Sequence, residues 1–230
     1  MVYVSRCLEY RPLTAILIPA YNVEPFIGSL VGRLKRDGSR VYVVDDGSSD
    51  STARAAGAAG AVVISNAVNK GKGAALREGF SRIIRDGFDC VLVMDGDGQH
   101  NPDDAARFFR KIEETDADIV VGNRMSDKAR MPFTRILINR LMSFLISKLS
   151  GQYIPDTQCG FRLIKRKALG GLEIVSSHYE AESELLLKAS RNGCRIASVP
   201  ITTIYHGSSS GIRPIKDTLR FIAMLIRFIV

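Results

Sequence analysis

The sequence contains no tryptophan, only three histidines and only four cysteines, and these shortages exclude several kinds of site. The cysteines lie far apart along the chain: Cys7, Cys90, Cys159 and Cys194. Without a CxxC pair, they are expected to be reduced, structural thiols rather than a disulfide framework. His100 and His206 belong to no HxxxH or HxC spacing, so zinc is not expected and each is interpreted as a hydrogen-bonding loop residue.

Other signals are also missing. No stretch reaches the roughly 18 consecutive apolar residues that a membrane-spanning helix needs, and the first residues do not form a basic segment followed by an apolar run. Neither a GxSxG elbow nor a GxxxxGK[ST] loop is present, and no GxGxxG follows the first expected strand. These absences disfavour a secreted protein, an α/β-hydrolase, a P-loop enzyme and a dinucleotide-binding enzyme.

Positive charge is in excess, because 32 Lys and Arg residues oppose 24 Asp and Glu residues and give a net charge of +8. The basic residues become dense between Arg124 and Arg166, without an aromatic-interleaved nucleic-acid motif. The charge therefore predicts an anionic partner, and we favour a phosphorylated ligand or a membrane surface over nucleic acid.

Short apolar runs alternate with helical patterns through residue 123. Buried strands are expected at 14–19, 41–44, 61–64, 91–94 and 118–121, and helices at 25–37, 52–59, 74–85 and from 102. This alternation predicts an α/β fold with a doubly wound, mainly parallel sheet and helices on both faces, in which ligands bind beyond the carboxyl ends of the strands. Further helices are expected at 132–150, 179–192 and 214–230, and strands at 161–165 and at 196–204, the latter broken by Pro200.

The stretch from Cys90 to Asp103 combines a buried strand with an abrupt acidic end. In extended backbone Asp95, Asp97 and Gln99 face one side, and glycines between them allow a ligand to approach closely. Such oxygens suit Mg²⁺ or Mn²⁺, which usually takes one or two carboxylates together with substrate phosphates. The alternative is a polar turn, which also favours Asp and Gly.

Other polar residues allow two interpretations each. Asp45 and Asp46 follow the second strand and either cap a turn or accept hydrogen bonds from a base or ribose. Lys72, taken alone, is interpreted as an exposed surface lysine. Three acids at the start of a helix, Glu180, Glu182 and Glu184, are expected to include one or two that face solvent, since a helix cannot point all three at one site.

Six segments occur in an order that resembles family 2 inverting glycosyltransferases, and in particular polyprenyl-phosphate glycosyltransferases such as dolichyl-phosphate mannose synthase. They are IPAYN at 18–22, VVDDGSSD at 43–50, NKGKG at 69–73, MDGDGQH at 94–100, GNR at 122–124 and DTQCGFR at 156–162. The resemblance extends from about Thr14 to Leu225. It implies a glycosyltransferase A fold with a catalytic domain over 1–213, followed by a basic, apolar amphipathic helix over 214–230.

The resemblance also implies roles for individual residues. The residues that would bind the nucleotide sugar are Pro19, Tyr21, Glu24, Asp45, Asp46, Lys72 and Asp95. The cation would be held by Asp95, Asp97 and Gln99. The residues that would bind the acceptor phosphate are Arg124, Arg135, Asn139 and Arg213. The family has a Ser-Lys pair near its tail where this chain has Ser210-Gly211, so Arg213 or Lys216 is the candidate replacement. Asp97, Arg124 and Arg135 are the expected catalytic residues, with Asp97 either orienting the sugar or serving only as a metal ligand.

The implied reaction is metal-dependent transfer of mannose or glucose, from GDP-mannose or UDP-glucose, to a polyprenyl (dolichyl) phosphate with inversion. The helices at 132–150 and 214–230 would then lie on the cytoplasmic face of a membrane, although packing against the sheet or against a second copy in a homo-oligomer remains an alternative. Competing hypotheses are a glycosyltransferase with a non-lipid acceptor, a sugar-nucleotide nucleotidyltransferase and a non-catalytic nucleotide-sugar sensor.

Overall fold

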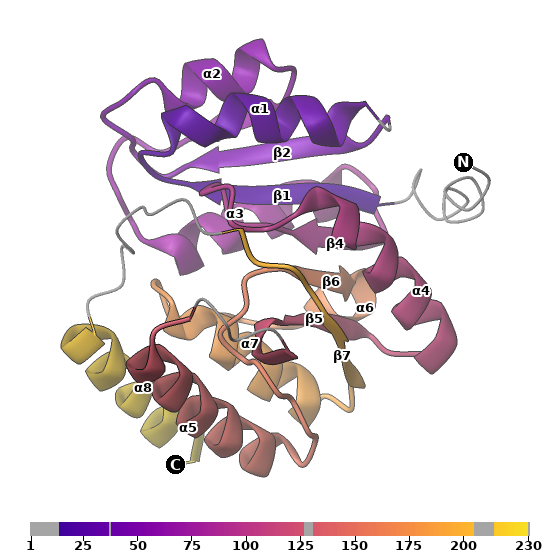
Figure 1. The fold of residues 1–230 in the computed structure, drawn as a ribbon, viewed down its shortest axis with the longest axis vertical. Helices are drawn as coiled ribbons and strands as arrows, with labels where there is room; N and C mark the ends of the chain where they lie inside the picture. The colour runs from indigo at the N-terminus through magenta and orange to yellow at the C-terminus, as the bar shows by residue number, and fades with distance from the viewer. Residues whose placement is uncertain (1–13, 37, 127–130, 205–213, 230) are drawn as a thin grey trace.

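Seven strands form a single sheet in the computed structural model, which describes residues 14–36, 38–126, 131–204 and 214–229 (Figure 1). Cys7, His206 and Arg213 lie outside the described residues. The strands are β1 (Thr14–Ala20), β2 (Arg40–Asp45), β3 (Val62–Ser65), β4 (Cys90–Val93), β5 (Ile119–Asn123), β6 (Arg162–Lys165) and β7 (Ile196–Pro200). Their apolar runs form because a strand covered on both faces needs continuous hydrophobic sequence, and every residue of β1 and β4 is buried.

The order of strands across the sheet is β3-β2-β1-β4-β6-β5-β7. All neighbouring pairs are parallel except those of β6, which runs antiparallel to both β4 and β5. The prediction of a mostly parallel α/β sheet is therefore confirmed. Strand β6, from a later segment of the chain, separates β5 from β4.

The helices are α1 (Glu24–Lys35), α2 (Thr52–Ala58), α3 (Lys72–Arg85), α4 (Ala105–Thr115), α5 (Phe133–Ser150), α6 (Arg166–Leu169), α7 (Glu180–Arg191) and α8 (Pro214–Ile229). Two 3₁₀ helices, η3 (Pro102–Asp104) and η4 (Arg124–Ser126), lie on either side of α4 and β5 along the chain. Pro25 occupies the first turn of α1, where its missing N–H costs nothing. Helix α3 begins at Lys72 rather than Ala74, β7 ends at Pro200 instead of resuming beyond it, and α6 was not predicted.

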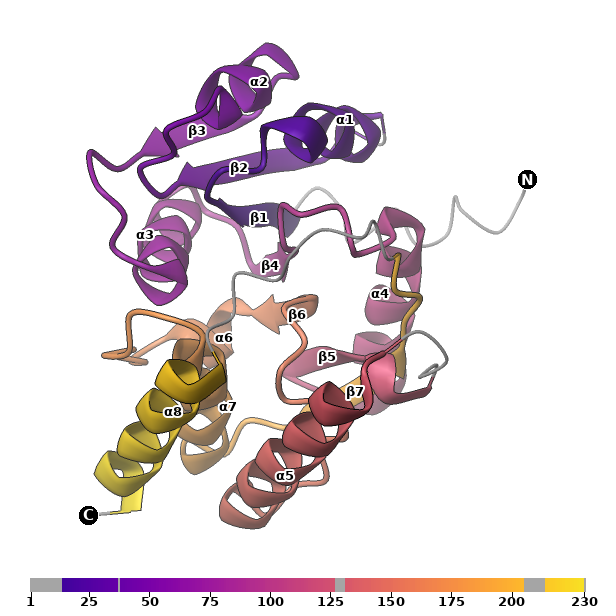
Figure 2. The same ribbon diagram turned by 60° about the vertical axis from the view of Figure 1, so that its left-hand side comes forward.

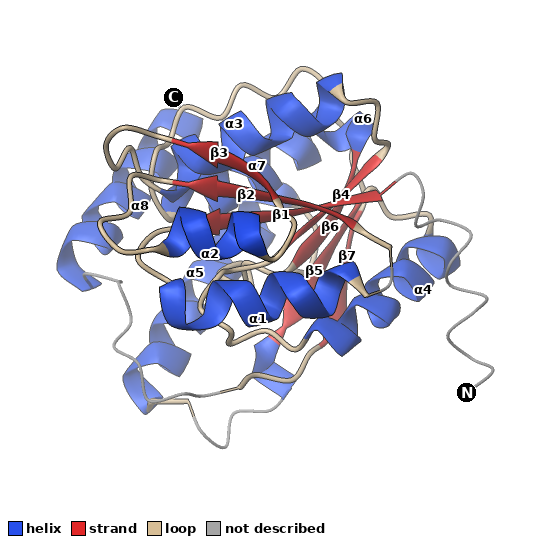
Figure 3. Ribbon diagram, turned by 90° about the horizontal axis from the view of Figure 1, so that it is seen from above, coloured by secondary structure: helices blue, strands red, loops and turns tan. Residues whose placement is uncertain are grey.

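Helices cover both faces of the sheet (Figure 3). Helices α1 and α4 lie on one face and α3 and α7 on the other. Helix α3 approaches β1 very closely, since a Cβ at Gly79 would lie 2.3 Å from Leu17 Cδ1. This close packing places the first residue of α3, Lys72, near the carboxyl end of the central strands.

Helices α5 and α8 both pack against α7 and run in the same direction (Figure 2). Helix α8 buries Phe221, Met224 and Phe228, and the guanidinium of Arg191 lies 3.5 Å from the Phe228 ring centroid. Their outer faces carry exposed apolar side chains: Phe133, Leu137, Ile138, Leu141, Phe144 and Leu149 on α5, and Leu219, Ile222, Ile226 and Ile229 on α8. Among the described residues, neither these helices nor any other combines the length and hydrophobicity that a bilayer crossing requires.

Candidate active site

The carboxyl ends of β1, β2 and β4 meet at one edge of the sheet, on the left in Figure 1, because these strands are parallel neighbours. Asp46, just after β2, is 3% exposed and accepts hydrogen bonds from Asn66 Nδ2 (3.0 Å), Lys70 N (3.0 Å) and Gly71 N (2.7 Å). Asp45 is also buried and accepts from Ser48 N at 3.3 Å. Asp46 therefore fixes the loop that leads into Lys72.

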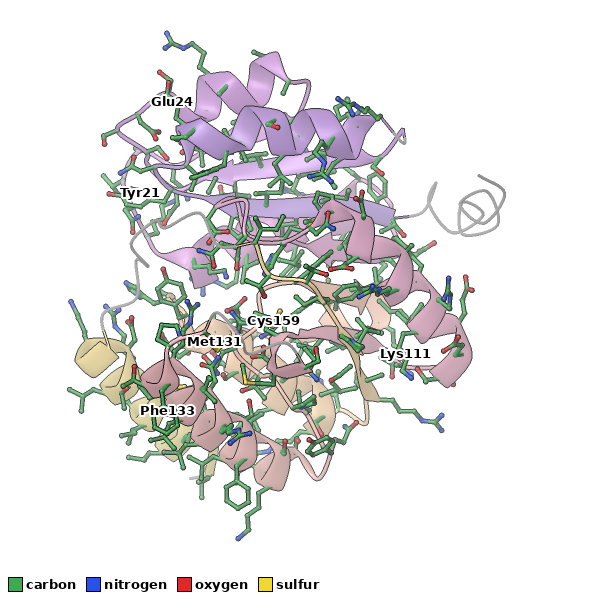
Figure 4. The ribbon with its side chains drawn as sticks, viewed as in Figure 1. Tyr21, Glu24, Lys111, Met131, Phe133 and Cys159 are labelled. Atoms are coloured by element: carbon green, nitrogen blue, oxygen red, sulfur yellow. The ribbon has the colours of Figure 1, made fainter. Side chains whose placement is uncertain are left out.

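The loops after β1 and β2 are tied together by side chains. Asn22, at φ 52°, accepts from Ser49 N at 2.9 Å, and Glu24 Oε2 accepts from Ser51 N at 3.0 Å. Pro19 is buried at the end of β1, whereas the Tyr21 side chain is exposed (Figure 4). Glu24 thus shapes this loop pair, and the Tyr21 ring is accessible to a planar ligand such as a base.

The acidic turn after β4 brings three of the predicted ligands to the same edge. Asp97 Oδ1 accepts from Gln99 N at 2.9 Å, and burial together with the Asp95 charge raises the pKa of Asp97. His100 is buried, stacks on Phe161 and accepts through Nδ1 from Asp95 N at 3.3 Å, which confirms its interpretation as a hydrogen-bonding loop residue. Burial lowers the pKa of His100 to about 4, so its ring is neutral near pH 7.

Lys72 lies between two carboxylates, so its interpretation as an exposed surface lysine is wrong. Its Nζ is 2.5 Å from Asp95 Oδ1 and 3.1 Å from Glu182 Oε1, and its side chain is 15% exposed. Burial disfavours the ammonium, but the charges of Asp95 and Glu182 outweigh it and raise the pKa of Lys72. Burial acts against the carboxylate of Asp95 too, yet the Lys72 charge holds its pKa well below the usual range.

The three acids at the start of α7 are all buried, which corrects the expectation that one or two face solvent. Each has a different environment, as the helix geometry requires. Glu182 pairs with Lys72, whereas Glu184 accepts from Val175 N (3.1 Å) and Ser176 N (2.8 Å). Glu180 is 8% exposed, and its Oε2 has no hydrogen-bond partner among the residues the structure describes. Sequence analysis missed Glu182 because its partner lies in a distant segment.

Arg124, the predicted acceptor-phosphate ligand, forms a buried pair with Asp156. Its Nε and Nη2 donate to Asp156 Oδ2 (2.8 Å) and Oδ1 (2.9 Å), and its backbone N donates to Oδ2 at 3.1 Å. Burial disfavours the guanidinium, but Asp156 raises the pKa of Arg124. Arg124 also stabilises the Asp95 carboxylate, so its charge acts on the acidic turn. No local pattern of residues indicates this pairing.

Two further candidates lie on α5. The charge of Arg135 reaches Asp97, where it lowers the pKa against the larger effects of burial and Asp95. Asn139, one turn later, is 6% exposed, and its Nδ2 has no hydrogen-bond partner within the described part of the chain. The start of α5 therefore faces the acidic turn. The predicted contribution of Arg213 lies outside the described residues.

Carboxylate oxygens such as those of Asp95 and Asp97 are the kind of ligand that a hard divalent cation prefers. Within residues 14–36, 38–126, 131–204 and 214–229, no group of three or more His, Cys, Asp or Glu side chains is placed to hold a metal alone. A cation here would therefore take its remaining ligands from water or from substrate phosphates, the usual arrangement for Mg²⁺. Gln99 can add an oxygen from the same turn.

Comparison with known proteins places these features in a family. The family model for glycosyl transferase family 2 matches residues 15–172. The chain is 32% identical to the UDP-N-acetylglucosamine–dolichyl-phosphate N-acetylglucosaminyltransferase of Methanococcus voltae, over 84% of this chain and 86% of that protein. It is 31% identical to the undecaprenyl-phosphate mannosyltransferase of Micrococcus luteus, over 82% of each chain.

Solved structures show the same fold. Glucosyl-3-phosphoglycerate synthase from Mycobacterium tuberculosis, in complex with Mn²⁺, UDP and glucosyl-3-phosphoglycerate, superposes with a TM-score of 0.73 over 98% of this chain and 83% of that chain, at 19% identity. The mixed seven-stranded sheet is thus a glycosyltransferase A-type fold, as the sequence predicted. The chain belongs to glycosyltransferase family 2.

Proposed function

We propose that this glycosyltransferase moves a hexose from a nucleotide-diphosphate sugar to the phosphate of a polyprenol, with inversion at the anomeric carbon. The observation that carries the proposal is the position of α5 and α8. Both helices begin on the side of the molecule where β1 and β2 end (Figures 1 and 2), and both carry rows of exposed apolar side chains. The names of the relatives, which include polyprenol, undecaprenyl-phosphate and dolichyl-phosphate enzymes, support a lipid acceptor.

The chemistry suits this acceptor. An oxygen of the lipid phosphate attacks the anomeric carbon, and the bond from that carbon to the diphosphate breaks, with the electron pair leaving on the nucleoside diphosphate. A phosphate is already anionic at neutral pH, so it needs alignment more than deprotonation, and Arg124 and Arg135 would supply the positive charge that aligns it. A divalent cation held by Asp95, Asp97 and Gln99 would neutralise charge on the departing diphosphate. Asp97 would additionally orient the sugar or serve solely as a ligand.

Charge supports contact with an anionic membrane surface. Helix α5 contains Arg135, Arg140 and Lys148 and no acidic residue, and α8 contains a single acid, Asp217, which pairs with Arg220. Helices with an apolar outer face and flanking basic residues bind at the interface of anionic bilayers. We infer that the protein works peripherally on the cytoplasmic face of a membrane. Self-association through these rows is the alternative.

The decisive assay incubates the chain with Mg²⁺ or Mn²⁺, a polyprenyl phosphate and radiolabelled GDP-mannose, UDP-glucose or UDP-N-acetylglucosamine. Label should enter the organic phase with one of these donors. Asp97→Asn should reduce transfer by about 100-fold or more, because a charge near the departing diphosphate is lost. Asp103→Asn, which alters an exposed carboxylate on η3, is the matched control and should retain activity. Full activity of Asp97→Asn would refute the role of the acidic turn.

Each alternative predicts a different product. Transfer to a saccharide or protein leaves the label in water, and release of pyrophosphate would indicate nucleotidyl transfer. Binding of nucleotide and cation without turnover would indicate a sensor. Family membership favours glycosyl transfer over the last two.

The membrane prediction has its own test, because the apolar row on α8 is separate from the residues that pack on α7. Replacement of Leu219, Ile222 and Ile226 by Ser should reduce co-sedimentation with anionic vesicles, while the free energy of unfolding stays within about 1.5 kcal/mol for three exposed changes. Tyr153→Ser, at a side chain that is 85% exposed and lies outside both helices, is the control. Equal vesicle binding by the triple variant would refute contact through α8, and a change in oligomeric size instead would support self-association.

A further inference from the structure

The Lys72 ammonium forms an ion pair with the Asp95 carboxylate, which the proposed divalent cation also needs as a ligand. Lys72 Nζ is 2.5 Å from Asp95 Oδ1, and the other oxygen, Oδ2, lies against the backbone of Gly160, where an added Cβ would be only 2.4 Å away. One oxygen of Asp95 is thus engaged by a cation, and the other lies beside the backbone of a glycine. A divalent cation can therefore use Asp95 fully only if the lysine side chain moves.

Charge balance indicates when that movement is favourable. A divalent cation alone would bring two positive charges next to Lys72, with the positive charge of Arg124 also acting on Asp95. A cation that arrives with a nucleotide-diphosphate sugar adds almost no net charge, because the two phosphates carry about two negative charges. The same diphosphate offers the displaced ammonium new oxygen partners.

Glu182 can keep the ammonium in place during this exchange. Its side chain is 6% exposed, and Oε1 lies 3.1 Å from Lys72 Nζ. The backbone of Lys72 is fixed because it opens α3 directly after Gly71, whose N–H donates to Asp46. Movement is therefore confined to the flexible four-carbon side chain, which can pivot while it remains paired with Glu182.

We propose that Lys72 is an internal counter-cation of Asp95. Its ammonium keeps a free metal ion away from the Asp95 carboxylate and leaves that carboxylate only when the metal ion and a nucleoside diphosphate bind together. Glu182 is the residue that positions the lysine. Cation and nucleotide binding are then positively coupled, and by linkage each strengthens the other by the same factor. The inference rests on the proposed donor and is independent of the acceptor.

The test measures binding of Mn²⁺ alone, and then with saturating UDP or GDP, by the electron paramagnetic resonance of free Mn²⁺. The wild-type chain should bind Mn²⁺ weakly alone and at least tenfold more tightly with one of the nucleotides. Lys72→Met should bind Mn²⁺ alone about tenfold more tightly than wild type, and the strengthening by the nucleotide should shrink correspondingly. Lys72→Gln provides a second neutral variant if Lys72→Met folds poorly.

Three controls separate this exchange from a general effect of charge. Lys72→Arg retains the positive charge and should resemble wild type. Lys70→Met removes an exposed charge two residues away, which contacts Asn66 rather than Asp95, and should leave Mn²⁺ binding unchanged. Glu182→Gln removes the second partner and should change Mn²⁺ affinity in the opposite direction to Lys72→Met, because the lysine then pairs with Asp95 alone.

Equal affinity of wild type and Lys72→Met for Mn²⁺ alone would overturn the inference while leaving the proposed function intact. A wild-type chain that binds neither Mn²⁺ nor nucleotide would overturn both. Coupled binding that changes with Lys72 as described, combined with no transfer to polyprenyl phosphate, would support the inference and refute only the proposed acceptor.

Discussion

Asp156→Asn should destabilise the protein strongly, although the change is nearly isosteric. Asp156 is 0% exposed and accepts three hydrogen bonds from Arg124, two of them from the guanidinium. The substitution leaves a buried positive charge without its counter-ion and turns an amide N–H₂ towards donors. Breaking a buried pair in this way costs about 3 to 5 kcal/mol. Because the whole domain is stable by only about 5 to 15 kcal/mol, this loss is a large fraction.

Urea unfolding provides the measurement, read as a lower midpoint at an unchanged denaturant slope. The control is Asp116→Asn, since that carboxylate is 83% exposed and lies 3.7 Å from Lys165 and Arg195, a geometry worth less than about 1 kcal/mol. The double variant Arg124→Met/Asp156→Leu removes both charges and should recover most of the lost stability.

The loss of stability caused by Asp156→Asn should also depend on pH, in a direction set by the pKa of Asp156. Burial raises the pKa of Asp156, but pairing with Arg124 outweighs it and leaves the pKa below its usual range. A depressed carboxyl pKa contributes stability that is complete above the unfolded-state value, about pH 4, and is lost as the pH falls through the folded-state pKa. The difference in the free energy of unfolding between wild type and Asp156→Asn should therefore be largest at pH 7 and should decrease below about pH 4. Equal midpoints for Asp156→Asn and Asp116→Asn at pH 7 would refute the reasoning.

Two further predictions concern the acidic turn. Gly160→Ala should lower the affinity for Mn²⁺ and nucleoside diphosphate about tenfold, measured by calorimetry, because the new Cβ would lie 2.4 Å from Asp95 Oδ2. Gly32→Ala is the control: its new Cβ would have no atom within 4 Å, so binding should be unchanged. His100 should titrate near pH 4 by NMR, and because its pKa is depressed by burial, the free energy of unfolding should fall by up to about 3 kcal/mol between pH 6.5 and 4. A pH dependence that His100→Gln does not flatten would contradict this assignment.

The elements that sequence analysis predicted well are those whose signal is local. The residues of β4 are buried, as an apolar run bounded by polar residues requires, and Pro25 marks the start of α1. The position of β6 between β4 and β5 has no such signal, because the residues Arg162–Lys165 predict a strand wherever in the sheet that strand lies. Strand order depends on packing between segments that are distant in sequence, and a single sequence does not report it.

The same limit explains the errors at the site. The acidic turn at Asp95 and Asp97 is visible in the sequence because its residues are adjacent. The burial of Lys72 and Glu182 is not visible, because each is tolerated inside the protein only through a partner from another segment. Arg124 and Asp156, 32 residues apart, form their pair for the same reason. Charged residues at a helix start are usually exposed, so the pattern favoured solvent-facing side chains where the structure has ion pairs.

These pairs change how substitutions at the site have to be interpreted. Asp46, Lys72 and Arg124, each expected to contact substrate, already have partners within the protein. If these residues contact substrate as proposed, ligand binding exchanges their internal partners for ligand atoms, and replacing one member both removes a ligand contact and leaves a buried charge without its counter-ion. The loss measured for a single variant contains both effects. Only a cycle that also replaces the internal partner, such as Lys72 with Glu182, isolates the interaction with the ligand, because coupling energies between contacting residues are not additive.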